Sequence, residues 1–329
     1  LEAEAVKFVA LADELLAAAP SLPAAGAGAG LGLAPTVLLR QHSAGAGSGG
    51  GKRMLMRIPF KRADCYTGHA DTIDACAAHL LAQQQQRRVA VLHGQPGTGK
   101  TVTAIEVVKR VEAALDVCLC FWIQGDGEAI LRRELERFGV AVVPGLSDDL
   151  EQDEVLRRVH AYLSRPEVDF RLVVDDLTDA ACLERYVPLD SAGARVLVTC
   201  HSERLFAAGQ AARFAMDVLS TSEAVELLCG SLVGGLTGKK RIERAADIDQ
   251  HVKAHPKLTD FMEQTLGNLP LTIVTVARAL SLAGATGAAL STEMEKVMAT
   301  VGEEVDVAPD KRHLRGLMGS VRAVMSRVE

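Results

Sequence analysis

The 329-residue chain lacks an excess of basic residues, a cysteine pair with metal-binding spacing and an uninterrupted apolar run of membrane-spanning length. Its 36 basic and 42 acidic residues give a net charge of −6. Nucleic-acid binding uses a basic surface, so we expect no nucleic-acid partner. The seven cysteines include no C-x-x-C pair, which favours reduced thiols in a cytoplasmic protein over a metal centre. Prolines and glycines interrupt residues 15–39, so we also expect no membrane span.

The first 53 residues show little of the patterning of a folded domain. Acidic residues near the start exclude a signal or transit peptide, and the chain begins with Leu1, so we expect it to be part of a longer protein. Residues 1–19 have the spacing of one helix, and the Gly/Ala-rich stretch 24–51 is typical of a flexible linker. No repeat of 20 to 50 residues is visible, which leaves solenoids and propellers out.

Residues 94–101 read Gly-Gln-Pro-Gly-Thr-Gly-Lys-Thr and match the pattern G-x-x-x-x-G-K-[ST]. Such a loop wraps backbone N–H groups around a phosphate chain, puts Lys100 near the β- and γ-phosphates and leaves the Thr101 hydroxyl for Mg²⁺. An apolar run at 89–93 and a helical pattern from Thr101 onward supply the strand and the helix that the motif requires. The predicted nucleotide-binding residues are Gly94, Gly97, Thr98, Gly99, Lys100, Thr101 and Val102.

A second apolar strand, at 170–174, ends in Asp175 and Asp176. Carboxylates at a buried strand end are costly unless they meet cations or donors, and open α/β sheets bind ligands at such ends. We expect Asp175 to hold Mg²⁺ together with Thr101, and Asp176 to orient or activate an attacking water. An Asp-rich turn without a ligand is the alternative.

A third strand, at 195–199, ends in polar residues that point to the same site. We expect Thr199 and His201 to face the γ-phosphate, where an imidazole could donate a hydrogen bond. The alternative is a loop histidine that caps the next segment. Default interpretations apply to two further residues: His93 as a packed strand-end residue and Trp122 as part of the core.

Five short apolar runs alternate with helical or turn segments, which predicts a parallel sheet covered on both faces. The runs lie at 89–93, 117–123, 170–174, 195–199 and 214–218. The expected helices within this part lie at 71–84, from 101 onward, at 127–138 and at 150–164. Beyond residue 218 the pattern becomes helical, beginning with a capping box at 220–223 and continuing at 257–266, 270–282, 291–301 and 311–328.

Taken together, these motifs resemble the NB-ARC module of STAND-class P-loop ATPases, found in plant disease-resistance proteins and the apoptotic protease-activating factor. The similarity spans roughly residues 60–329. It implies a P-loop NTPase fold with a five-stranded parallel sheet of order 5-1-4-3-2, followed by a smaller all-α, ARC1-like domain. The implied domains are a helix and linker at 1–53, a nucleotide-binding domain at 54–218, the helical subdomain at 219–310 and the start of a further part at 311–329.

The resemblance also assigns roles to individual residues. The segment 66–70 looks like the element that precedes the P-loop in the family, which implies adenine contact by Tyr66 and Thr67. The segment 267–271 is similar to the Gly-Leu-Pro-Leu motif, which implies that Pro270 packs on the adenine, although it also fits an ordinary helix end and helix start. His201 stands where the family commonly has arginine.

The resulting hypothesis is an ATP/ADP-binding switch in which ADP with Mg²⁺ fixes a closed state and ATP permits opening and self-assembly. Lys100, Asp176 and His201 are the predicted catalytic residues for slow hydrolysis. Effector and sensor domains would lie outside the chain. Two alternatives are an AAA+-like remodelling ATPase, in which Gly-Thr-Gly-Lys-Thr is equally at home, and an adaptor that binds nucleotide without hydrolysis.

Overall fold

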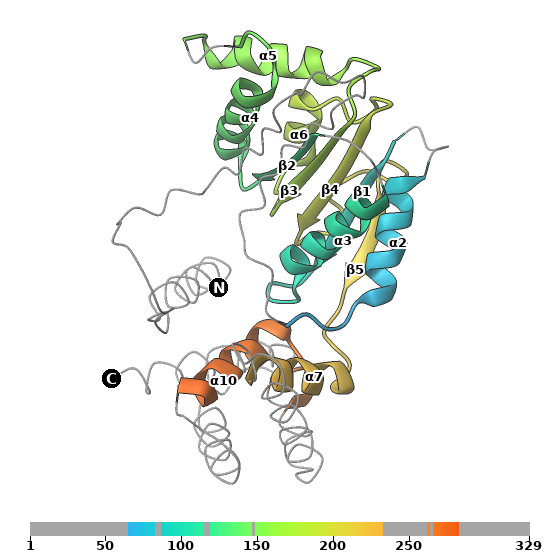
Figure 1. The fold of residues 1–329 in the computed structure, drawn as a ribbon, viewed down its shortest axis with the longest axis vertical. Helices are drawn as coiled ribbons and strands as arrows, with labels where there is room; N and C mark the ends of the chain where they lie inside the picture. The colour runs from blue at the N-terminus through green and yellow to red at the C-terminus, as the bar shows by residue number, and fades with distance from the viewer. Residues whose placement is uncertain are drawn as a thin grey trace, which may run out of the picture. The chain divides into compact units, whose positions relative to one another are not determined.

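The computed structural model describes residues 65–82, 87–114, 119–146, 149–232, 262–263 and 266–282. Their centre is a five-stranded parallel sheet with the strand order β2-β3-β4-β1-β5 (Figure 1). Read from the other edge, this is the predicted order 5-1-4-3-2, which is confirmed. The strands are β1 (Val89–Gly94), β2 (Leu119–Gln124), β3 (Phe170–Asp175), β4 (Ala194–Cys200) and β5 (Ala212–Met216).

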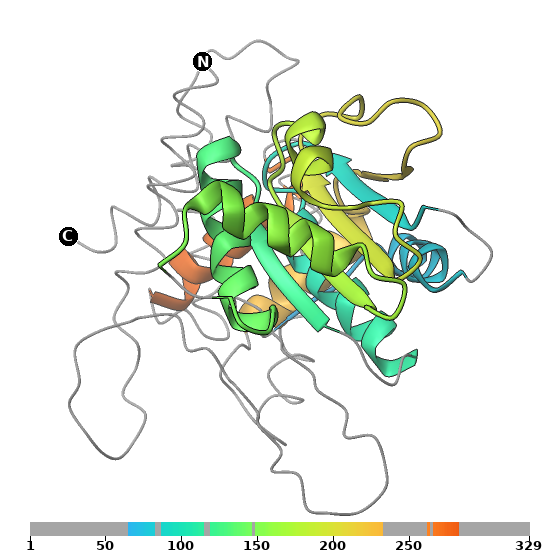
Figure 2. The same ribbon diagram turned by 90° about the horizontal axis from the view of Figure 1, so that it is seen from above.

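Helices cover both faces of this sheet, as the views in Figures 1 and 2 show. One face packs against α2 (Ala70–Leu81) and α3 (Lys100–Ala114). The other packs against α4 (Glu128–Val142), α5 (Gln152–Leu163) and α6 (Ala180–Tyr186). Side chains alternate along each strand, so Ala90 faces the first pair of helices and Val91 the second set. Burial on both sides explains why the strands read as nearly continuous apolar runs.

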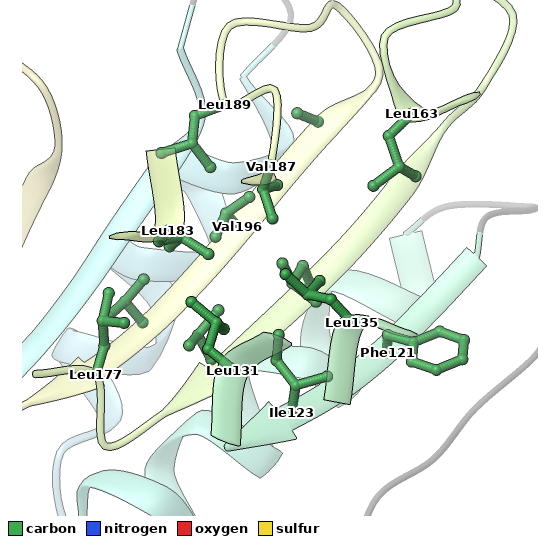
Figure 3. Packing of buried hydrophobic residues seen from close by; sticks show 14 of the residues in the cluster. Phe121, Ile123, Leu131, Leu135, Leu163, Leu177, Leu183, Val187, Leu189 and Val196 are labelled. Carbon is green, nitrogen blue, oxygen red and sulfur yellow. The ribbon is translucent and has the colours of Figure 1, made fainter. Parts of the chain in front are cut away.

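The core beneath α4 and α5 contains many of the large, fully buried side chains of the sheet domain (Figure 3). Phe138 of α4 is 2% exposed and meets Phe121 of β2 edge-on, with 4.0 Å between the ring centroids. Leu135 and Leu131 lie one and two turns earlier on the same helix face and enter the same cluster. The spacing of these residues is the helical period that the sequence predicts for this segment.

A separate apolar cluster joins α7 (Thr221–Leu232) and α10 (Pro270–Leu282). The predicted capping box opens α7: the Glu223 carboxylate accepts from the Ser220 N–H at 2.9 Å, and the Ser220 hydroxyl oxygen accepts from the Glu223 N–H at 3.4 Å. Helix α10 has the predicted bounds. The predicted helices at 291–301 and 311–328, most of that at 257–266 and the segment 1–53 lie outside the described residues, and the domain boundaries stay predictions.

Several predicted boundaries are wrong by a few residues. The fifth strand ends at Met216 and not at Val218, because Met216 pairs with Gly94 and β1 then turns into the P-loop, leaving the following residues without a partner strand. Val218 is accordingly 44% exposed. Helix α4 continues past Phe138 to Val142, and α2 ends at Leu81, short of the predicted residue 84. Helix α6 was not predicted, because seven residues are too few for a clear period.

Replacing Phe138 by alanine should destabilise the sheet domain by about 3–5 kcal/mol, because a cavity replaces a fully buried ring. Chemical unfolding of the variant measures this loss. Val218→Ala, at an exposed position, is the control and should change the free energy of unfolding by no more than about 0.5 kcal/mol. Equal losses in the two variants would contradict the described packing.

Candidate functional site

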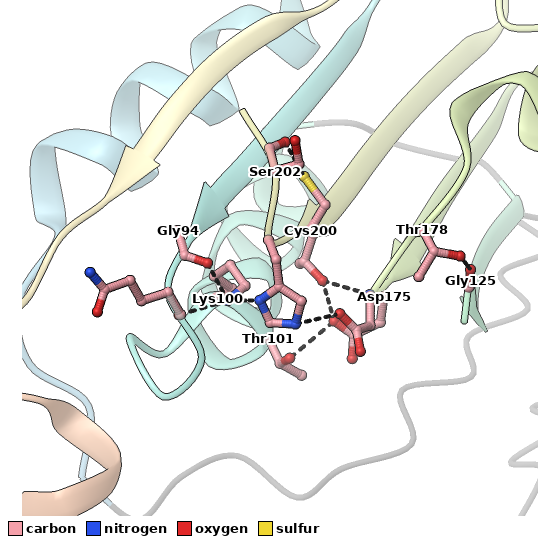
Figure 4. Close-up of polar contacts among 12 residues, drawn as sticks. Gly94, Lys100, Thr101, Gly125, Asp175, Thr178, Cys200 and Ser202 are labelled. Carbon is pink, nitrogen blue, oxygen red and sulfur yellow. Dashed lines mark hydrogen bonds and ion pairs between the residues drawn. The ribbon is translucent and has the colours of Figure 1, made fainter. Parts of the chain in front are cut away.

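The P-loop links the end of β1 to the first turn of α3 (Figure 4). Two of its glycines, Gly97 with φ 83° and Gly99 with φ 91°, have backbone conformations that L-residues rarely adopt. The Thr98 side chain between them is buried and donates to the Gln95 carbonyl at 2.9 Å. Because α3 begins at Lys100, its unbonded N–H groups and its positive dipole end face the loop. This is the backbone arrangement that binds phosphate groups.

The Lys100 ammonium lies inside the loop. It donates to the carbonyl oxygens of Gly94 at 3.0 Å and Gln95 at 2.8 Å, and the residue is 8% exposed. Burial lowers the pKa of Lys100 from its ordinary value, while the charge of Asp176 acts in the opposite direction. The loop carbonyls thus hold the desolvated Lys100 ammonium close to the backbone N–H donors. An anion bound there could replace these carbonyls as the hydrogen-bond partner of Lys100.

The Asp175 carboxylate, 4% exposed, is the meeting point of three elements. Its Oδ1 accepts from the Thr101 hydroxyl of α3 at 3.0 Å and from the Thr199 hydroxyl of β4 at 2.6 Å. Gln124, which pairs in register with Asp175 across β2 and β3, adds a side-chain hydrogen bond. Burial raises the pKa of Asp175, and the three hydrogen bonds counteract that rise. The carboxylate is thereby held at a fixed position beside the P-loop.

A chain of polar contacts joins the P-loop lysine to Asp176 through His201. The Lys100 Nζ lies 3.4 Å from His201 Nδ1, and His201 Nε2 lies 3.1 Å from Asp176 Oδ1. An ammonium can only donate, so Nδ1 accepts and the ring proton sits on Nε2, from which it is donated to Asp176. The hydrogen bond from His201 lowers the pKa of Asp176 and so favours its ionised form. Asp176 has a left-handed φ of 57°, which aspartate tolerates better than most residues.

The donor set suits a magnesium ion. The Thr101 hydroxyl and the Asp175 carboxylate, 3.0 Å apart, offer the oxygen ligands that Mg²⁺ prefers, and few protein ligands are needed because water and phosphates complete its octahedron. The described part of the chain contains no cluster of three or more His, Cys, Asp or Glu residues suited to a metal ion. Thr101 and Asp175 are the residues that would hold it.

The P-loop also contacts the segment that opens α10. The Leu271 N–H donates to the Gly97 carbonyl at 3.2 Å. A Cβ placed on Gly97 would lie 3.1 Å from the Leu271 Cβ and 3.2 Å from the Leu269 side chain, so the two segments touch. Pro270, the predicted adenine contact, is the first residue of α10 and lies between the two residues that make this contact. A hydrogen bond therefore joins the P-loop, which would hold phosphates, to the first turn of α10.

Residues 66 and 67, the other predicted adenine contacts, bridge to different elements. The Tyr66 hydroxyl lies 3.0 Å from the Thr103 hydroxyl of α3. The Thr67 hydroxyl donates to the Glu226 carboxylate of α7 at 2.7 Å. The segment preceding α2 therefore connects the P-loop helix with α7.

The structure brings most of the predicted residues together, although it does not test their roles. Lys100, Thr101, Asp175, Asp176 and His201 form one connected network. Val102 lies half-buried in α3, behind the loop. His93 is half-buried at the end of β1, and Trp122 is 3% exposed in the sheet core. Sequence reasoning missed Gln124, for which the signal was its position as the last residue of an apolar strand that pairs with the acidic strand.

Fold and site define a P-loop NTPase: a parallel sheet, a phosphate-binding loop at the carboxyl end of β1, and an acidic strand, β3, whose Asp175 reaches the helix that follows this loop. The family model described as "NB-ARC domain" matches residues 69–234, half of the chain, and the chain belongs to this family. The match includes the P-loop, both aspartates, His201 and α7. Membership implies that the chain binds a nucleotide.

Solved structures resemble the chain at low identity. "Structure of Drosophila ORC bound to DNA" shows 17% identity over 79% of this chain and 80% of that chain, with a TM-score of 0.39. CDC6P from Pyrobaculum aerophilum shows 16% over 79% and 86%, with a TM-score of 0.38. A STAND protein with a tetratricopeptide repeat sensor from Pyrococcus horikoshii shows 12% over 79% of this chain and 40% of that chain, with a TM-score of 0.40. No curated protein matches the sequence.

At these identities and TM-scores, the solved structures say nothing about the ligands or partners of this chain. Within the described ranges, no helix is long and apolar enough to cross a membrane.

A matched pair of glycine variants tests the contact between the P-loop and α10. Gly97→Ala and Gly99→Ala should each cost roughly 1–2 kcal/mol of stability, because both residues have left-handed φ. Only Gly97→Ala should also increase amide hydrogen exchange over 269–273, since nothing lies within 4 Å of a Cβ at Gly99. The same exchange in both variants would contradict the contact.

Proposed function

We propose that this chain is an ATP/ADP-binding molecular switch in the cytoplasm, with an ADP-bound closed state and ATP-driven opening that permits self-assembly in signalling of the defence or cell-death type. The observation that supports it best is the hydrogen bond from the Leu271 N–H to the Gly97 carbonyl. Because Gly97 belongs to the phosphate-binding loop, a change in the loop's conformation alters this bond directly. The site is therefore mechanically linked to α10.

Nucleotide binding would use donors that the chain already presents. Bound Mg²⁺ would neutralise part of the phosphate charge. Lys100 would exchange the carbonyls of Gly94 and Gln95 for phosphate oxygens, and Thr101 and Asp175 would turn their oxygens to the metal. These exchanges replace internal bonds of the P-loop by bonds to the ligand, so the nucleotide state and the loop conformation depend on each other.

Hydrolysis would rest on Asp176 and His201. Asp176, kept ionised by the His201 Nε2–H, can accept a proton from an attacking water or orient it. His201 offers at most two N–H donors, whereas the arginine of related sequences is always charged and offers five, so we expect His201 to stabilise developing phosphate charge less. We therefore expect slow turnover, which suits a switch that must remain in each state.

The helical segments around α7 and α10 would read the nucleotide state. Pro270 opens α10 within the segment that contacts the P-loop, and Thr67 ties the segment before α2 to Glu226 of α7. A nucleotide whose base lies against Pro270, Tyr66 and Thr67 would contact both the P-loop helix and these segments. Such a ligand shifts the equilibrium by its different affinity for the closed and open states.

The two alternatives differ in what they require. An AAA+-like remodelling ATPase needs rapid repeated hydrolysis, for which a histidine in place of an always-charged arginine is poorly suited. An adaptor without hydrolysis needs no residue to orient a water, yet Asp176 has its own positioning partner in His201. Both observations favour the switch.

Assembly measured as a function of nucleotide tests the proposal. In light scattering after gel filtration, the full chain with ADP and Mg²⁺ should stay monomeric, and a non-hydrolysable ATP analogue should produce larger species. Lys100→Ala removes charge-assisted bonds to phosphate, so about ten to a hundred times more nucleotide should be needed for the same effect.

Lys109→Ala is the matched control, because this lysine of the same helix pairs with Glu106 outside the loop. It should behave like the unaltered chain. Assembly that is identical with ADP, with the ATP analogue and without nucleotide would contradict the switch, and unchanged nucleotide affinity in Lys100→Ala would contradict the site.

A further inference from the structure

Three arginines lie side by side where the strands of the sheet begin, at the end opposite the P-loop. Arg171 of β3 pairs in register with Arg195 of β4, and Arg88, directly before β1, takes the position next to Arg195. Neighbouring strands lie about 4.8 Å apart. Each arginine precedes by two positions a residue of the core beneath α2 and α3, so all three belong to that face of the sheet. We call them the arginine row.

The arginine row is buried and incompletely paired. Arg88 is 8% exposed, Arg171 is 6% exposed and the Arg195 side chain is 12% exposed. In each of the three, the Nε atom is buried without a hydrogen-bond partner. Buried guanidinium groups are costly unless they are paired, and like charges on adjacent strands repel each other. The row is a concentration of positive charge that the fold must balance.

Among the described residues, fewer negative charges than positive ones lie at the arginine row. Glu112 of α3 interacts electrostatically with Arg171, and Asp169 accepts a hydrogen bond from Arg195 Nη1 at 3.3 Å. Two carboxylates therefore face three guanidinium groups. Part of the remaining donor capacity goes to neutral carbonyls, as in the bond from Arg88 to the Ala192 oxygen.

Asp169 marks the side on which an anion can enter. Its carboxylate is 59% exposed, and its 3.3 Å bond to Arg195 is longer than the roughly 2.7–2.9 Å of a tight charged pair. Solvent screening makes such a pair weak. A negatively charged group from solution can thus take the place of this carboxylate on the row without losing a strong internal bond.

We propose that the arginine row binds a phosphate-sized oxyanion, either free inorganic phosphate or the phosphate group of a small monoester. Guanidinium groups offer paired N–H donors that match the oxygens of such anions, and three adjacent ones exceed what the two carboxylates neutralise. The site lies where the strands begin, whereas the P-loop lies where they end. It is therefore separate from the nucleotide site and does not depend on the proposed switch.

A purely structural role for the arginine row makes a different prediction. If the row only braces the loop before β4, through contacts such as that of Arg88 with Ala192, its variants change stability by the same amount with and without phosphate. If the row binds an anion, phosphate stabilises the folded chain in proportion to its affinity. Removing an arginine of the row should then lower the affinity for phosphate, and removing a neighbouring carboxylate should raise it.

The test measures thermal unfolding of the full chain carrying Lys100→Ala, which weakens the P-loop for phosphate. Inorganic phosphate is titrated against chloride at constant ionic strength. We expect a saturable rise of the midpoint, a half-saturation concentration at least tenfold higher in Arg171→Gln, and a severalfold lower one in Glu112→Gln, where a competing carboxylate is removed. A second titration uses glycerol 3-phosphate. A saturable rise of the midpoint with this compound shows that the site accepts monoesters, and no such rise assigns the site to the free phosphate ion.

Arg110→Gln is the matched control, because it removes the same charge from α3 at an exposed pair with Asp74. Its half-saturation concentration should stay within twofold of the parent's. If Arg171→Gln does not fold, Glu112→Gln and Asp169→Asn carry the test, since both should strengthen binding. A midpoint that does not saturate with phosphate, or equal responses in Arg171→Gln and Arg110→Gln, overturns the site.

Discussion

The buried carboxylate of Asp175 is the interaction on which the rest of the site depends. It holds together the end of β3, the first turn of α3 through Thr101 and the end of β4 through Thr199. Asp175 meets both hydroxyls where β4 lies between β1 and β3, so the chemistry of the site depends on the strand order. An acid buried to this degree is tolerated because hydroxyl donors satisfy it, and the same oxygens are what a magnesium ion would use.

From that centre the structure extends in two directions. In one direction, Asp176, His201 and Lys100 form a chain from carboxylate to ammonium. In the other, the P-loop is bonded through Gly97 to the start of α10, and the segment before α2 reaches α7 through Thr67. A ligand at the P-loop would therefore act on this polar chain and on the helical segments together, which is the arrangement that the proposed switch requires and a simple phosphate-binding turn does not.

Much of this was predictable from the sequence because its signals are local or topological. The P-loop pattern and the two aspartates after an apolar strand predict that Thr101 and Asp175 lie close together. Alternation of strands and helices predicts a parallel sheet covered on both faces, and the resemblance to the NB-ARC module implies the order of its strands. The hydrogen bond between Leu271 and Gly97 was not predictable, because it joins backbone atoms of segments more than 170 residues apart and leaves no side-chain pattern. The end of β5 was missed because it depends on where its neighbour β1 leaves the sheet. His201 was predicted at the site, but its contacts with Lys100 and Asp176 were not, because they depend on side-chain geometry.

The arginine row adds a second charged centre at the opposite end of the strands. Both centres consist of groups that are costly to bury, and they differ in sign and in how completely the chain satisfies them: hydroxyl and amide donors surround Asp175, whereas the Nε atoms of the row have no partner. The two ends of the strands in one sheet would thus bind different ligands. The P-loop site is the one that family membership supports.

The most direct test of the central claim, a nucleotide held between the P-loop and the segment bearing Pro270, is to identify what co-purifies with the chain. Mass spectrometry of the denatured protein should find ADP at close to one equivalent, and much less in Lys100→Ala. An empty site in the unaltered chain, or the same nucleotide content in both proteins, would contradict the account.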